Sequence, residues 1–120
     1  MNNYNNDLCK SLSNSKFRSK FHLTEKDIKY VNEKGLSTIE KHARDFINKR
    51  LKPEIILNDG KQTPMKGHPV FIAEHATATC CRQCLYKWHK ITPNHELTDE
   101  EIDYIIKIIM IWITKQISAK

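Results

Sequence analysis

Residues 98–117 read TDEEIDYIIKIIMIWITKQI and predict a long, largely apolar helix. Thr98 and Glu101 have the spacing of a capping box, which marks the start of a helix. Apolar side chains then repeat at helical spacing along one face: Ile102, Ile105, Ile106, Ile109, Trp112 and Ile113. Much of the opposite face is also apolar, through Ile108, Met110 and Ile111. Such a helix lies at the centre of a fold or is buried in a partner. We favour the central position over a homodimer seam.

The same segment is too short to cross a membrane. Its most apolar stretch, Tyr104–Ile113, is ten residues long and contains Lys107, whereas a transmembrane helix needs about 20 apolar residues. The amino terminus, MNNYNNDLCKSLSNSK, lacks the apolar region of a signal peptide. The sequence therefore predicts a cytoplasmic protein, whose cysteines are thiols or metal ligands rather than disulfides.

The composition favours one helical domain. A chain of 120 residues suffices for a single domain. Three glycines and four prolines are too few for the many turns of a β-sandwich or barrel. Residues 1–16 are rich in Asn and Ser and predict a flexible polar tail. Residues 17–120 are expected to form a single α-helical domain.

Two more helices are predicted over residues 24–34 and 37–51. Thr24 suits an N-cap, because an acidic residue follows three positions later. Ser37 is followed by Glu at the same spacing, which is typical of a capping box. Gly35, between the two helices, occupies the usual position of a left-handed C-cap.

The middle of the chain predicts a long central loop followed by two short helices. Residues 52–69, KPEIILNDGKQTPMKGHP, contain the loop signal Asn-Asp-Gly and prolines. Pro69 suits the first turn of a helix, and Thr79 is placed to N-cap another helix that ends before Pro93. The expected fold is an all-α bundle of about five helices with a long central loop.

The densest chemistry lies in residues 67–89, GHPVFIAEHATATCCRQCLYKWH. Cys81 and Cys84 form a C-x-x-C pair whose thiolates face the same way in the first turn of a helix. His75 precedes them across a bend and is a candidate third ligand. This set predicts a transition-metal site, most simply zinc. Two further histidines are candidates for the fourth ligand, His68 and His89.

Helical geometry argues against two neighbours of this site. Cys80 and Cys81 would lie about 100° apart on a helix, so both are not expected to bind one ion. His89 would lie about 12 Å along the axis beyond Cys81, so it fits only if the helix ends early.

Two other interpretations of the cysteines remain open. Cys81 could be a nucleophile with His75 as its base and Cys84 as a resolving thiol, without a metal. Alternatively, Cys80, Cys84 and Trp88 recur every four residues, which is typical of the inner stripe of a core helix.

The net charge of +6 permits an anionic partner such as nucleic acid. Basic residues gather in the first 20 residues and in residues 60–91. Three side chains are candidates for holding an anion near the cysteines: Lys61, Thr63 and Arg82. The alternative is that these lysines form a solvated face.

Three stretches resemble a known family: FRSKF at 17–21, HARDFINKRL at 42–51 and NDGKQTPMKGHPVFIAEHATATCCRQCLYKWHKI at 58–91. They are similar to a small bacterial family of unknown function with a GKQTPM…GHPVF…HATATCC-x-x-C-L-x-K-W-H signature. The resemblance runs from Lys16 to Ile117. It implies a bacterial or phage source and carries no activity. Its polar signature favours a functional site over core thiols.

Overall fold

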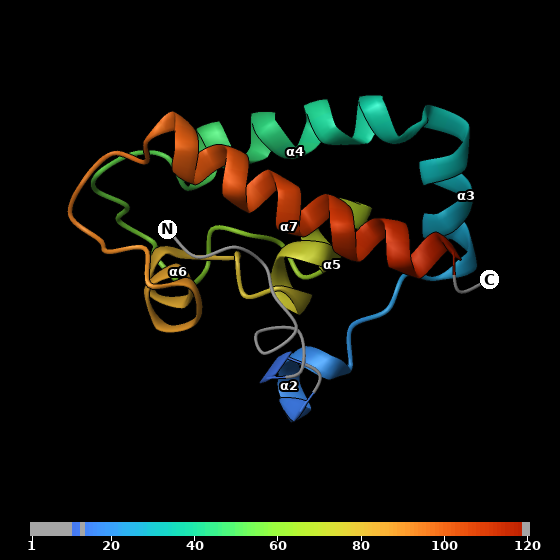
Figure 1. The fold of residues 1–120 in the computed structure, drawn as a ribbon, viewed down its shortest axis with the longest axis horizontal. Helices are drawn as coiled ribbons and strands as arrows, with labels where there is room; N and C mark the ends of the chain where they lie inside the picture. Colours follow the sequence, from blue (N-terminus) through green and yellow to red (C-terminus); the bar gives the residue numbers. More distant parts are fainter. Residues whose placement is uncertain (1–10, 13, 119–120) are drawn as a thin grey trace.

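Six helices with defined bounds, and no strand, lie within residues 11–12 and 14–118, the part of the chain that this computed structural model describes (Figure 1). They are α2 (Lys16–Ser19), α3 (Glu25–Lys34), α4 (Leu36–Arg50), α5 (Pro69–Ala76), α6 (Arg82–His89) and α7 (Asp99–Ser118). The all-α prediction is confirmed. The number differs from about five because the short helix α2 was not expected.

Helix α7 is the central element, as its sequence predicts. It packs against α4 and α5 (Figure 1). Seven of its side chains are buried: Ile102, Tyr104, Ile105, Ile106, Ile108, Ile109 and Ile113. Met110, Ile111 and Trp112 are only partly buried. Burial of so much apolar surface, at roughly 25 cal/mol per Å², makes α7 the main source of core stability. A homodimer seam through residues 98–117 remains a prediction.

The predicted helix starts at Thr24, Pro69 and Thr98 are confirmed. The Thr24 hydroxyl accepts a hydrogen bond from the Asp27 backbone, and the Asp27 carboxylate accepts one in return. Thr98 and Glu101 form the same reciprocal pair before α7. Pro69 is the first residue of α5, where its missing N–H costs nothing.

The predicted caps at Ser37 and Thr79 are wrong. Helix α4 begins at Leu36, directly after Gly35, whose φ of 87° lets the chain turn sharply from α3 into α4. Ser37 therefore lies inside the helix. Thr79 does not cap α6, because its hydroxyl contacts the Thr77 hydroxyl at 3.0 Å. Cys81 is the N-cap instead.

The long central loop is confirmed between α4 and α5, and it is fastened to the core by Arg82. The buried guanidinium donates hydrogen bonds to the backbone carbonyls of Leu51, Pro53 and His95 at 2.7–3.0 Å. It thereby ties both the start of this loop and the segment before α7 to the start of α6. In this position, the loop contacts the turn between α5 and α6 that carries Cys80 and Cys81.

Most of the predicted tail, residues 1–16, lies outside the described residues. Leu12 is described and buried, and Ser15 caps α2 through its hydroxyl. Within the described ranges, none of the helices has the length and apolar character needed to cross a membrane.

Candidate metal centre

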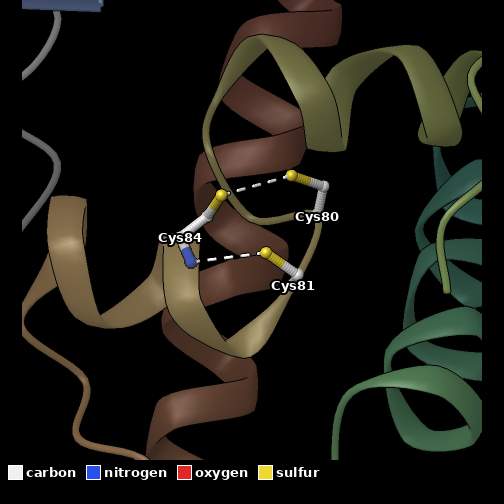
Figure 2. A group of neighbouring side chains, drawn as sticks. All are labelled: Cys80, Cys81 and Cys84. Atoms are coloured by element: carbon white, nitrogen blue, oxygen red, sulfur yellow. Dashed lines mark hydrogen bonds between the residues drawn. The ribbon is translucent and has the colours of Figure 1, made fainter. Parts of the chain in front are cut away.

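Three cysteine sulfur atoms meet at the start of α6 and lie within 4.8 Å of one another (Figure 2). Cys80 and Cys81 belong to the turn between α5 and α6, and Cys84 lies in the first turn of α6. The Sγ atoms of Cys80 and Cys84 are 3.7 Å apart. This cluster could hold a metal ion.

The turn before α6 explains why adjacent cysteines can point to one place. Ala78 adopts a left-handed conformation with φ of 60°, and Cys81 is extended with φ of −158°. Neither Cys80 nor Cys81 is helical, so the 100° helical offset between them does not apply. The expectation that Cys80 stays outside the site is therefore wrong on geometry.

Buried threonines hold this turn in shape. The Thr77 hydroxyl donates to the Ala73 carbonyl at 2.7 Å, and the Thr79 backbone N–H donates to the Glu74 carbonyl at 2.8 Å. From the central loop, the Thr63 hydroxyl donates to the Cys80 carbonyl at 2.7 Å. These bonds satisfy backbone groups that burial would otherwise leave unpaired.

A buried arginine from α2 contacts the cluster. Arg18 donates through Nη2 to Cys84 Sγ at 3.0 Å and through Nη1 to Cys80 Sγ at 3.5 Å. Nη1 also donates to the His75 carbonyl oxygen at 2.8 Å. Arg18 joins two segments more than fifty positions apart in the sequence.

The cluster places its negative charge on Cys84. Hydrogen bonds from Cys80 and Cys81, together with the charge of Arg18, hold the pKa of the Cys84 thiol far below its usual range. Hydrogen bonds to Cys81 and Cys84, and burial, raise the pKa of Cys80. Both shifts favour Cys84 over Cys80 as the site of a thiolate.

One ring nitrogen of His75 is buried and has no hydrogen-bond partner within the described residues. Its Nε2 lies 3.2 Å from the carbonyl oxygens of Thr63 and Pro64. Carbonyl oxygens only accept, so Nε2 carries the proton. Nδ1 is this buried nitrogen. Burial lowers the pKa of His75 despite these two bonds, so the ring is neutral.

The other two predicted histidine ligands have protein partners on both ring nitrogens. His68 accepts from the Val70 backbone at 3.0 Å and contacts His42 at 3.1 Å. His89 lies 2.8 Å from the Thr77 carbonyl and 3.1 Å from the Tyr104 hydroxyl. The structure does not gather either of them with the sulfur cluster.

Two of the three predicted anion-binding side chains are occupied by hydrogen bonds within the protein. The Thr63 hydroxyl is bound to the Cys80 carbonyl, and the Arg82 guanidinium is bound to three carbonyls. Lys61 is exposed. Thr63 and Arg82 shape the turn that carries the cysteines, and this is a structural role that helical spacing does not reveal.

Sequence reasoning missed Cys80 and Arg18. Helical spacing excludes Cys80 only if the helix already includes it, and α6 begins at Arg82. Arg18 lies in FRSKF, one of the three stretches that resemble the family, and this resemblance was a signal for it. No local pattern predicts that this stretch packs onto residues 75–84.

The sulfur cluster fits a metal ion in both spacing and chemistry. Tetrahedral zinc with bonds of about 2.3 Å to sulfur requires sulfur atoms roughly 3.8 Å apart, and the Cys80–Cys84 separation is 3.7 Å. His75 has its Nε2 proton on carbonyls and a bare Nδ1, which is the arrangement of metal-binding histidines. Its Nδ1 is not among the atoms that lie within 4.8 Å of one another.

No solved structure matches this chain. The family model described as "Domain of unknown function (DUF4186)" matches residues 6–114, which is most of the chain. This match confirms the resemblance to a family of unknown function. On that evidence the chain belongs to the DUF4186 family.

Proposed function

We propose that this chain is a zinc-binding domain in which Cys80, Cys81, Cys84 and His75 hold one metal ion. The observation that carries the proposal is the convergence of three sulfur atoms within 4.8 Å of one another. The buried and unpartnered Nδ1 of His75 supports the fourth position.

The ligand chemistry favours zinc over larger or harder ions. Thiolate and imidazole ligands suit Zn²⁺, whereas Mg²⁺ and Ca²⁺ prefer oxygen. A four-iron cluster would require more widely separated sulfur atoms than a mononuclear tetrahedral ion. Four protein ligands leave no open position for a water molecule, so the metal would stabilise the fold rather than act as a catalyst.

Elemental analysis tests the proposal directly. Protein purified without chelator and without a His-tag should contain about one zinc per chain. Cys84→Ser should lose the metal, while Cys9→Ser should retain it and serves as the matched control. His75→Gln should weaken binding, while His22→Gln, at an exposed histidine, should not. A metal-free wild-type protein would refute the proposal.

Thiol titration gives an independent answer. The chain has four cysteines, three of which lie in the cluster. In native holo-protein, the three cluster cysteines should be protected from a thiol reagent, and a chelator should make them reactive. Metal removal should also lower the unfolding temperature, because the site contributes directly to folding.

A metal-free thiol enzyme is the second candidate, and the 3.0 Å contact between Arg18 and Cys84 favours it. That contact stabilises a thiolate, so the nucleophile would be Cys84 rather than the Cys81 expected from the sequence. Mass spectrometry after brief iodoacetamide treatment would distinguish the two functions. Rapid labelling of Cys84 in wild-type protein that carries no metal would support the thiol enzyme.

An anionic partner, including nucleic acid, remains a proposal supported by the net charge of +6 alone. Four lysines are exposed on or near the cysteine-bearing segment: Lys61, Lys66, Lys87 and Lys90. Binding of a labelled oligonucleotide should weaken steeply with salt if these lysines contact phosphates. Salt-independent binding, or none, would remove this partner.

A further inference from the structure

Arg18 is a buried cation whose anionic partner is the sulfur cluster. Its side chain is only 8% exposed. Among the described residues, no carboxylate forms an ion pair with it. Within the described part of the chain, its guanidinium donates hydrogen bonds to Cys84 Sγ, Cys80 Sγ and the His75 carbonyl. A buried cation without a counter-charge is costly, so the charge of the cluster decides whether Arg18 is stable in this place.

Metal loading would give the cluster a charge that Arg18 matches. A divalent ion bound by three thiolates carries a net charge of −1, and a neutral His75 adds none. One guanidinium then neutralises the loaded site. In the loaded site, both sulfur atoms that Arg18 contacts would be thiolate ligands, so both hydrogen bonds would be charge-assisted.

Helix α2 is attached to the core through this same site. Arg18 is the buried residue of α2. Just beyond the helix, Phe21 stacks on the His75 ring with centroids 5.5 Å apart. Helix α2 also packs against α5, which carries His75 (Figure 1). The segment of residues 15–21 therefore rests on residues that the proposed function assigns to the metal.

We propose that Arg18 is the counter-cation of the metal–thiolate centre, and that metal binding and docking of residues 15–21 reinforce each other. This inference rests on the proposed zinc site. Because the coupling is a free energy shared by two equilibria, each strengthens the other by the same factor. Arg18 is thus a positioning residue for the site, and it reaches the site from a distant part of the sequence.

Zinc affinity measured by competition with a chromophoric chelator tests the first half of the coupling. Arg18→Gln should weaken zinc binding by roughly 10–100-fold, the usual effect of removing an outer partner of a metal ligand. Arg18→Lys keeps the positive charge but loses the several N–H donors of the guanidinium. Its zinc affinity should therefore lie between those of wild type and Arg18→Gln. The matched control is Lys16→Gln, an exposed cation on the same helix, and its affinity should equal that of wild type.

Hydrogen–deuterium exchange tests the second half on the wild-type protein. Zinc should slow exchange of the amides of residues 15–21 by the same factor that Arg18→Gln costs in affinity. In Arg18→Gln, zinc should leave these amides unchanged. This readout separates coupling from a general loss of stability, because amides of the core helix α7 provide an internal reference.

The outcomes separate failure of the inference from failure of the zinc site. If wild type and Arg18→Gln both bind about one zinc with equal affinity, the zinc site stands and the inference is overturned. Faster exchange of residues 15–21 on adding zinc would also overturn it, since the metal would then displace the guanidinium. If wild type binds no zinc, the proposed function fails first. An Arg18→Gln variant that folds only with excess zinc supports the coupling.

Discussion

Glu74 offers the sharpest test of the physical description of the core. It lies in α5 with its side chain fully buried, and neither carboxylate oxygen has a hydrogen-bond partner within the described ranges. Burial raises the pKa of Glu74 to about 8, although the positive charge of Arg50 opposes the rise. At neutral pH the group is therefore mostly protonated. The substitution Glu74→Gln keeps the size and shape of this side chain and removes the group that ionises.

The sign of the effect follows from proton linkage. The pKa of Glu74 is about 8 in the folded chain and 4.5 as the reference value, so the folded chain binds this proton more tightly. The stability that the protonated group contributes is complete below about pH 4.5 and is lost as the pH rises through 8. Each pH unit in this interval costs about 1.4 kcal/mol.

Between about pH 5 and pH 7.5, the wild-type protein should therefore lose about 3 kcal/mol of unfolding free energy that Glu74→Gln retains. For a chain of this size, that is a difference of roughly 10 °C in unfolding temperature. Urea unfolding followed by circular dichroism, at constant zinc, measures it across this pH range. Other titrating groups cancel in the comparison.

The matched control is Glu40→Gln, at an exposed position of α4. Its stability should follow the wild-type dependence on pH. If Glu74→Gln loses stability between pH 5 and pH 7.5 as steeply as wild type does, then Glu74 is ionised in the folded chain and has a cationic partner. The description of α5 as a helix with an isolated buried carboxyl would then be refuted.

Four further outcomes are expected from the structure. Burial lowers the pKa of His68 to about 4, so wild type should lose about 1–2 kcal/mol as the pH falls from 6.5 to 4, allowing for partial exposure. Urea unfolding should show a smaller loss for His68→Gln, and the wild-type loss for His22→Gln. Arg82→Gln leaves three backbone carbonyls without their hydrogen-bond donor. It should lower the unfolding free energy measured in urea by about 2–4 kcal/mol. Arg44→Gln, which breaks an exposed ion pair, should cost less than about 1 kcal/mol. Gly35→Ala places a side chain at φ of 87° and should lower the unfolding free energy by about 1 kcal/mol.

The sequence predicts the helices whose signals are local. Thr24 and Thr98 each have their acidic partner three residues later, and both capping boxes form. The apolar pattern of residues 98–117 predicts the central position of α7. Such signals depend on groups within one helical turn, so no tertiary information is needed.

The predicted N-caps at Ser37 and Thr79 are wrong because neighbouring residues favour a different start of the helix. Gly35 with a positive φ lets α4 begin one residue before Ser37. The hydroxyl of Thr79 is used by Thr77, so α6 begins only after Cys81. In each case the sequence motif is compatible with an N-cap, but the helix begins at another residue, with Gly35 as the N-cap of α4 and Cys81 as the N-cap of α6.

The candidate site was predicted where the ligands are close in sequence. Cys81, Cys84 and His75 were named from spacing and remain in the proposed ligand set. Arg18 could not be placed, because its contact with Cys84 joins residues 66 positions apart. Helical spacing contains no information about which distant segment covers a turn.

The conformation of Ala78 explains why Cys80 can join the sulfur cluster, although helical spacing predicts that it lies outside the metal site. Ala78 adopts φ of 60° although it is not glycine, which costs roughly 1 kcal/mol or more. It is also fully buried, so the surrounding contacts must hold it there. Strained residues of this kind persist where the fold fixes them, and they cluster at functional sites. Here the strain bends the chain between His75 and the cysteines. That bend takes Cys80 off the helix, so its sulfur can meet that of Cys84, and the maintained strain therefore favours a ligand site over an inert core stripe.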